Sequence, residues 1–162
     1  MYLMVDFVID FLRNYFSANV GVFLAGTLPV TELRAAIPLG VSLGMEPWVT
    51  FFYAVLGNLL PIPILLALLP RLLTHVPPTS LLGRALRWCV RRTLKRTKRL
   101  ERLGALGLMI FVLIPLPGTG AWTASLAAVL FRISPSLALP SISIGVVGAG
   151  IIVTLLSIGL FH

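Results

Sequence analysis

Glu32 and Arg34 are the residues best suited to chemistry, because they carry opposite charges within an otherwise apolar stretch. If this stretch enters a membrane, inserting either charge alone costs roughly 2.5–3.5 kcal/mol, so such charges are paired or face a water-filled cavity. A carboxyl group there can carry protons, and a guanidinium group can bind an anion or pair with the carboxylate. We predict that Thr31, Glu32 and Arg34 bind a substrate or an ion. The alternative is a structural ion pair, either within the helix bundle or at the membrane surface.

The segment from Ile114 to Thr123, with sequence IPLPGTGAWT, is the second candidate. Its prolines and glycines interrupt a helix, and a second helix starts after them. The start of that helix presents backbone N–H groups and the positive end of its dipole, which suit an anion or a phosphate. The Thr119 and Thr123 hydroxyls would add donors. The predicted binding residues here are Pro115, Pro117, Gly118, Thr119, Gly120 and Trp122. The alternative is a plain turn in which Trp122 only packs. The glycines do not form a nucleotide-binding loop, because no Lys-Ser/Thr pair follows them.

Asn58 lies in the middle of a long apolar run, where it can either line a cavity or hydrogen-bond to a facing helix. The sequence offers no catalytic triad, no paired carboxylates and no cluster of metal ligands. Apart from Glu32, the acidic residues stand at the edges of apolar runs: Asp6, Asp10, Glu46 and Glu101. The single cysteine excludes an intramolecular disulfide and any CxxC site. We expect neither an enzyme nor a cofactor or metal.

The composition of the chain indicates that these residues lie in a membrane protein. The chain has 162 residues, of which 58% are hydrophobic and 11% charged, and its mean hydropathy is +1.02. These values exclude a water-soluble monomer. Residues 1–17 resemble a signal peptide in length, but Asp6 and Asp10 interrupt the apolar run. Their spacing predicts an amphipathic helix in the membrane interface.

Two runs are long enough to cross a membrane, which takes about 20 apolar residues. These predicted spans are 47–70 and 135–160. In the second span, Ser141, Gly145 and Ala149 form a stripe of small residues that allows another helix to approach closely.

Shorter apolar runs flank two predicted helix breaks, at 28–34 and 114–120, and each run is long enough for only half a bilayer. Proline and glycine at the breaks prevent a continuous helix. We therefore predict re-entrant helical hairpins at 18–44 and 104–131. Each hairpin precedes one span, so 18–74 and 104–161 form an inverted repeat. The predicted fold class is an all-α integral membrane protein.

Residues 81–103 link the two repeats and hold nine of the thirteen basic residues. The excess of positive charge predicts that this linker is cytosolic and that both termini lie outside. The linker is predicted to be a helix that contacts anionic lipid head groups, and nucleic acid is not an expected partner. An apolar stripe follows one face of it: Leu82, Leu86, Cys89, Val90, Leu94, Leu100 and Leu103.

Four segments in order carry a family resemblance that extends over nearly the whole chain: Leu28–Gly40, Gly57–Pro63, Gly104–Gly107 and Ile114–Thr123. They are similar to the family of putative small multidrug export proteins. This family is distantly similar in plan to the DedA/VTT superfamily, whose paired re-entrant hairpins are associated with lipid flipping or proton-coupled transport. The resemblance implies a transporter. The second hairpin here differs from the superfamily pattern, because it has no acidic residue and no arginine before Arg132.

We predict a small proton-coupled exporter of small molecules or drugs, with its substrate between the two hairpin tips and with Glu32 carrying protons. One alternative is a flippase or scramblase for an anionic lipid such as a polyprenyl phosphate, held by Arg34 and the half-helix start at 118–123. Another is a non-transporting membrane scaffold. Two full spans per chain favour a homodimer or a higher homo-oligomer. The expected location is the cytoplasmic (inner) membrane of a prokaryote.

Overall fold

The computed structural model describes residues 17–77, 79–97, 103–116 and 118–161. The predicted interfacial helix at 1–17 therefore lies almost wholly outside the described residues. Every regular element within them is a helix, as the sequence predicts. The helices are α2 (Ala18–Thr27), α3 (Glu32–Ser42), α4 (Pro47–Leu59), α5 (Pro61–His75), α6 (Leu81–Thr97), α7 (Gly104–Leu113), α8 (Ala121–Leu130) and α9 (Pro135–Phe161).

In the part of the chain that the structure describes, two helical stretches are long and apolar enough to cross a membrane, Pro47–His75 and Pro135–Leu160. The first comprises α4 and α5 and continues past the predicted end at residue 70. Pro47, Pro61 and Pro135 each begin a helix. Proline is tolerated there because the first N–H groups of a helix have no partner within it.

The short helices end where the sequence predicts breaks. Leu28 has an extended backbone with φ −80° and ψ 140°, and Ile114 has φ −81° and ψ 110°. Each of these residues precedes a proline, whose ring disfavours helical geometry in the residue before it. Consequently α2 and α3 are separated at Leu28–Thr31, and α7 and α8 at Ile114–Gly120. The first break is shorter than the predicted 28–34, because Glu32 and Arg34 already belong to α3.

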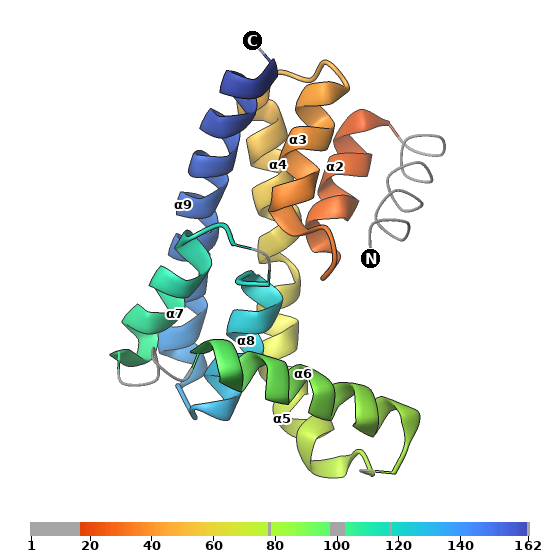
Figure 1. Cartoon of the computed structure of the whole chain (residues 1–162), viewed down its shortest axis with the longest axis vertical. Coiled ribbons are helices and arrows are strands. Elements are labelled where there is room, and N and C mark those ends of the chain that lie inside the picture. The colour runs from red at the N-terminus through yellow and green to blue at the C-terminus, as the bar shows by residue number, and fades with distance from the viewer. Residues whose placement is uncertain (1–16, 78, 98–102, 117, 162) are drawn as a thin grey trace. The chain divides into compact units, whose positions relative to one another are not determined.

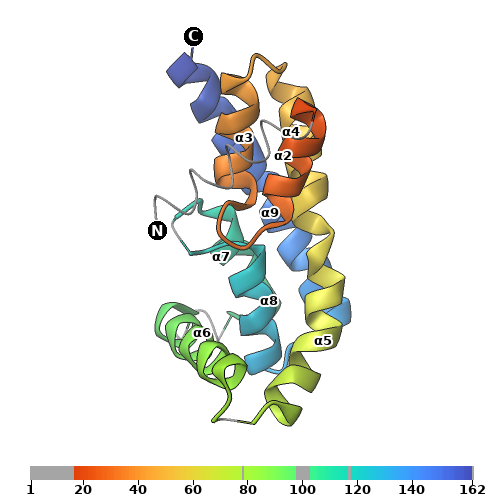
Figure 2. The ribbon, with the colours of Figure 1, turned by 90° about the vertical axis from the view of Figure 1, so that its right-hand side faces the viewer.

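The chain divides into two compact units, and we describe each by itself. The first unit includes α2, α3, α4 and the part of α9 from Val146 onward. Here α2 and α3 pack against each other and against α4 (Figures 1 and 2). Glycine makes these contacts close, since a Cβ on Gly26 would lie 2.6 Å from the Ala54 carbonyl oxygen. Close backbone packing of this kind is what joins helices in a membrane, where burial from water contributes little.

The second unit includes α5, α6, α7, α8 and the part of α9 up to Gly145. Its core cluster is Leu65 and Leu69 from α5 with Leu126 from α8. At Gly145 in the predicted small-residue stripe, an added Cβ would lie 2.8 Å from the Met109 carbonyl oxygen of α7. This contact agrees with the expectation that the stripe admits a neighbouring helix.

Helix α6 lies across α8 (Figure 1), and only part of its apolar stripe is packed against the unit. Cys89 and Val90 pack against the core cluster, but Leu94 is 38% exposed and Leu103 is 51% exposed. Thr93 and Thr97 are buried instead. Thr93 and Thr97 continue the line that runs through Cys89 at helical spacing, whereas Leu94 is turned about 100° away from Thr93. Leu94 therefore lies at the edge of the apolar stripe rather than in the core of the unit.

Candidate functional site

Thr31 closes the break between α2 and α3. Its side-chain hydroxyl donates a hydrogen bond to the Ala25 carbonyl oxygen in the last turns of α2, and Thr31 is 3% exposed. Carbonyl groups at the C-terminal end of a helix have no helical partner, so a hydroxyl can satisfy one of them. The side chain of Thr31 therefore holds the chain in its turn toward α3.

Glu32 is the first residue of α3 and is buried, with 7% of its surface exposed. Its backbone N–H donates to the Leu28 carbonyl oxygen at 3.0 Å, and its φ is +47°. A positive φ is uncommon for residues other than glycine and is often found where a side chain is held for a function. Arg34 lies two residues further along α3 and is half-buried.

Few other charges accompany Glu32. Among the described residues of this unit, 17–61 and 146–161, formal side-chain charges occur at Glu32, Arg34 and Glu46. Glu46 is exposed at the start of α4, where its carboxylate accepts from the Val49 N–H at 2.7 Å. The buried carboxyl of the unit is therefore that of Glu32.

Asn58 lies near the end of α4 and is 1% exposed. Neither its side-chain oxygen nor its side-chain nitrogen has a hydrogen-bond partner among the described residues. Leaving such a group unsatisfied costs about 1–3 kcal/mol. A ligand or a water molecule that hydrogen-bonds to this amide would recover much of this cost.

The packing register places Asn58 at the depth of Glu32. An added Cβ on Gly40 of α3 would meet the Thr50 side chain of α4, and the two helices run in opposite directions (Figure 1). Glu32 is eight residues before Gly40, and Asn58 is eight residues after Thr50. At ~1.5 Å per residue, both lie about 12 Å from that contact in the same direction. The packing of α2 on α4 gives the same depth, because an added Cβ on Gly57 would lie 3.3 Å from the Cα of Gly26, two residues before that break.

A second polar level in this unit was not predicted from the sequence. Thr50 and Thr154 are both fully buried, and the Thr154 hydroxyl has no partner among the described residues. Gly150 of α9 packs against Phe51 and Val55 of α4, and the two helices are antiparallel (Figure 1). The register therefore places Thr154 near the depth of Thr50. A single threonine in an apolar helix gives no sequence pattern by which it could have been found.

The second break, in the other unit, is held mainly by its own hydrogen bonds. The Thr119 hydroxyl donates to the Ile114 carbonyl oxygen at 2.7 Å and accepts from the Leu116 N–H at 3.2 Å. Gly118 has φ +82°, which glycine adopts without strain. Trp122 packs against the core cluster. Pro115 is half-buried and Gly120 is buried where α8 begins, while Pro117 lies outside the described residues.

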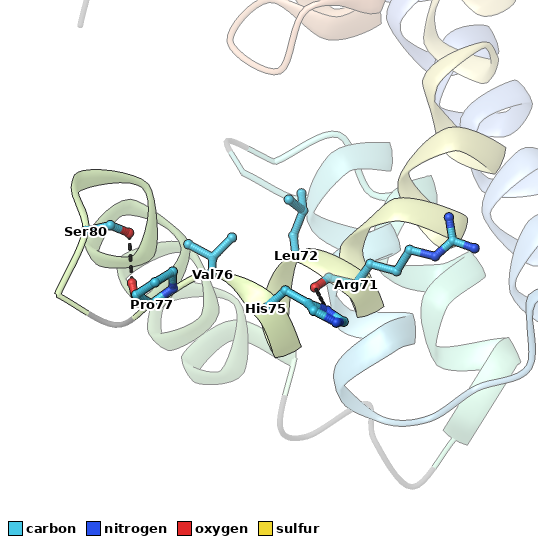
Figure 3. A pocket seen from close by; sticks show the side chains of 6 residues that line it. All are labelled: Arg71, Leu72, His75, Val76, Pro77 and Ser80. Atoms are coloured by element: carbon cyan, nitrogen blue, oxygen red, sulfur yellow. Dashed lines mark hydrogen bonds between the residues drawn. The ribbon is translucent and has the colours of Figure 1, made fainter.

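The predicted residues thus fall into two groups. Thr31, Glu32, Arg34 and Asn58 belong to the first unit, and the residues of the second break belong to the second unit. A separate hollow of about 580 Å³ lies where α5 meets the turn to α6. Figure 3 shows its lining: Arg71, Leu72, His75, Val76, Pro77 and Ser80. None of the predicted site residues lines it.

Comparison with known proteins gives one family. The family model described as "Putative small multi-drug export protein" matches residues 32–152, which is about three quarters of the chain. No curated protein and no solved structure matched the chain. The matched region contains Glu32, Asn58 and the second break, as the four sequence segments led us to expect. The chain therefore belongs to the family of putative small multi-drug export proteins.

Proposed function

We propose that this protein exports small molecules across a membrane in exchange for protons, and that Glu32 carries the proton. The observation that supports this most is the burial of Glu32 beside the Leu28–Thr31 break, in a unit whose other described charges are Arg34 and an exposed Glu46. Ionisable groups within membrane segments mark ion pathways and proton relays. Irregular backbone beside such a group is typical of transporter binding sites.

A buried carboxyl group is suited to exchange one cation for another. Its ionised form is costly without a compensating positive charge. It can be compensated by a bound proton or by a bound cation, and the two compete for the same oxygen atoms. A protonatable or cationic substrate that displaces the proton from Glu32 would therefore be coupled to proton movement.

Asn58 would orient such a substrate. Its amide offers both a donor and an acceptor at the depth of Glu32, and both atoms lack a partner among the described residues. Thr31 has a positioning role in this proposal, because its hydroxyl already donates to the Ala25 carbonyl. Arg34 would partly compensate Glu32 during the exchange itself, after the proton has left and before the cation is bound.

The test uses purified protein in liposomes under an imposed pH gradient, with a panel of cationic drugs and a labelled polyprenyl phosphate. We expect drug-dependent proton flux in the wild type and its loss in Glu32→Gln. Glu46→Gln is the matched control, since it makes the same change at an exposed carboxylate whose capping role glutamine can preserve. Equal flux in Glu32→Gln and the wild type would contradict the proposal.

Two other outcomes would replace the proposal. Lipid movement that needs no gradient, survives Glu32→Gln and fails in Arg34→Ala would identify a flippase for an anionic lipid. No transport by the wild type, together with loss of cellular function on charge reversal in 81–103, would identify a scaffold.

The proposal includes an orientation and an assembly. We place the protein in the cytoplasmic membrane of a prokaryote, with the basic linker on the cytosolic side. The two breaks would be the tips of re-entrant hairpins. The irregular backbone at these tips would have to be buried away from lipid, and two spans per chain are too few to bury it. We therefore expect a homo-oligomer, in which neighbouring copies cover it.

A further inference from the structure

Helix α6 has a positively charged face that the proposed transport does not use. Arg84, Arg87, Arg91, Arg92 and Lys95 are all exposed. They follow the spacing of one side of a helix, and no acidic residue occurs between Leu81 and Thr97. The opposite side is fixed, because Cys89 and Val90 pack against the core of the second unit. The basic side therefore faces away from that core.

Trp88 stands in the middle of this basic face and is 57% exposed. The Arg92 guanidinium lies 5.3 Å from the centre of its ring. Trp88 and its neighbours Arg84, Arg87 and Arg91 line a surface hollow of about 530 Å³. An exposed indole surrounded by arginines has an apolar ring and a polar N–H, which suits the boundary between lipid head groups and acyl chains.

The position of α6 in the chain brings this face to that boundary. The apolar helical stretch Pro47–His75 has 29 residues, or about 43 Å of helix, whereas the hydrocarbon core of a bilayer is about 30 Å thick. The end of α5 therefore reaches the head-group region. Helix α6 begins six residues after His75, and its Cys89 and Val90 pack against the cluster that Leu65 and Leu69 of α5 form with Leu126 of α8.

We propose that Arg84, Arg87 and Arg91, with Trp88 between them, form a binding site for the phosphate head group of an anionic phospholipid. Arginine binds phosphate through paired N–H donors, and the indole ring packs on the glycerol and upper acyl region of the same lipid. Each arginine near an anionic surface strengthens binding about fivefold. This site is independent of Glu32 and of transport.

The test measures which lipid lies next to Trp88. The sequence has three tryptophans, so a variant with Trp48→Phe and Trp122→Phe retains Trp88 as its single tryptophan. It is placed in nanodiscs in which either phosphatidylglycerol or phosphatidylcholine is brominated high on the acyl chains, at one fixed lipid composition. We expect brominated phosphatidylglycerol to quench Trp88 several-fold more strongly than its mole fraction predicts.

Arg87→Gln/Arg91→Gln removes two charges from the site, and Arg71→Gln/Arg132→Gln removes two exposed arginines of the same unit outside it. We expect the first pair to abolish the preference for phosphatidylglycerol and the second pair to change it less than twofold. Equal losses in both pairs would overturn the proposal, because net charge alone would then explain binding. Quenching of Trp88 by brominated phosphatidylglycerol in simple proportion to its mole fraction would also overturn the proposal, because the site would then bind no anionic lipid preferentially.

Discussion

At the scale of residues, the first unit buries several polar side chains among its apolar helices. Glu32 and Asn58 are buried at one depth, and both Asn58 amide atoms have no partner among the described residues. Thr31, in contrast, is buried with its hydroxyl bonded to the Ala25 carbonyl. Buried polar groups with partners stabilise a fold, whereas those without partners cost stability. This contrast separates a structural role from a binding role.

The substitution Asn58→Leu tests whether the Asn58 amide has a binding role or a structural role. Because the substitution removes a buried amide without removing an observed hydrogen bond, we expect an unchanged or higher melting temperature in detergent. We expect at least a tenfold loss of drug transport in liposomes. Thr31→Val is the comparison, since it loses a hydrogen bond worth about 1 kcal/mol and should melt earlier. A lower melting temperature for Asn58→Leu would show that the amide is structural.

At the scale of elements, proline determines where helices break, and glycine determines how closely they pack. Leu28 and Ile114 are extended because each precedes a proline. Helices α2 and α4 approach so closely that a Cβ on Gly26 or Gly57 would collide with backbone carbonyl groups. The depth of Asn58 relative to the first break depends on this packing.

Gly26→Ala is expected to destabilise the first unit. The added methyl group would lie 2.6 Å from the Ala54 carbonyl oxygen, and overpacking of this kind costs roughly 1–3 kcal/mol. Gly159→Ala is the matched control, since nothing lies within 4 Å of its Cβ position and alanine is the better helix former. Thermal unfolding in one detergent compares the two. Equal melting temperatures would show that α2 and α4 are not packed at Gly26.

At the scale of the whole molecule, the chain combines two apolar helical stretches with a strongly basic helix between them in sequence. The two breaks were predictable because proline acts on its own neighbours in the chain. The shared depth of Glu32 and Asn58 was not predictable, because it depends on contacts at Gly40 and Gly57 between different helices. Thr93 and Thr154 were missed for the same reason, since tertiary packing rather than residue type decides their burial.

The proposed orientation predicts where the C-terminus lies. If 104–131 is a re-entrant hairpin and the basic linker is cytosolic, the chain after His162 is outside the cell. A phosphatase fused after His162 should then be active, and a fluorescent protein that folds only in the cytosol should be dark. The reverse pattern would mean that 104–131 crosses the membrane as a kinked span.

The most direct test of the central claim is proton release on substrate binding. Purified protein in weakly buffered detergent solution is mixed with tetraphenylphosphonium, and a pH-sensitive dye reports released protons while isothermal titration reports bound cation. The account predicts that wild type and Glu46→Gln release about one proton for each bound cation, and that Glu32→Gln releases none. Proton release by Glu32→Gln equal to that of the wild type would contradict the assignment of Glu32 as the proton carrier.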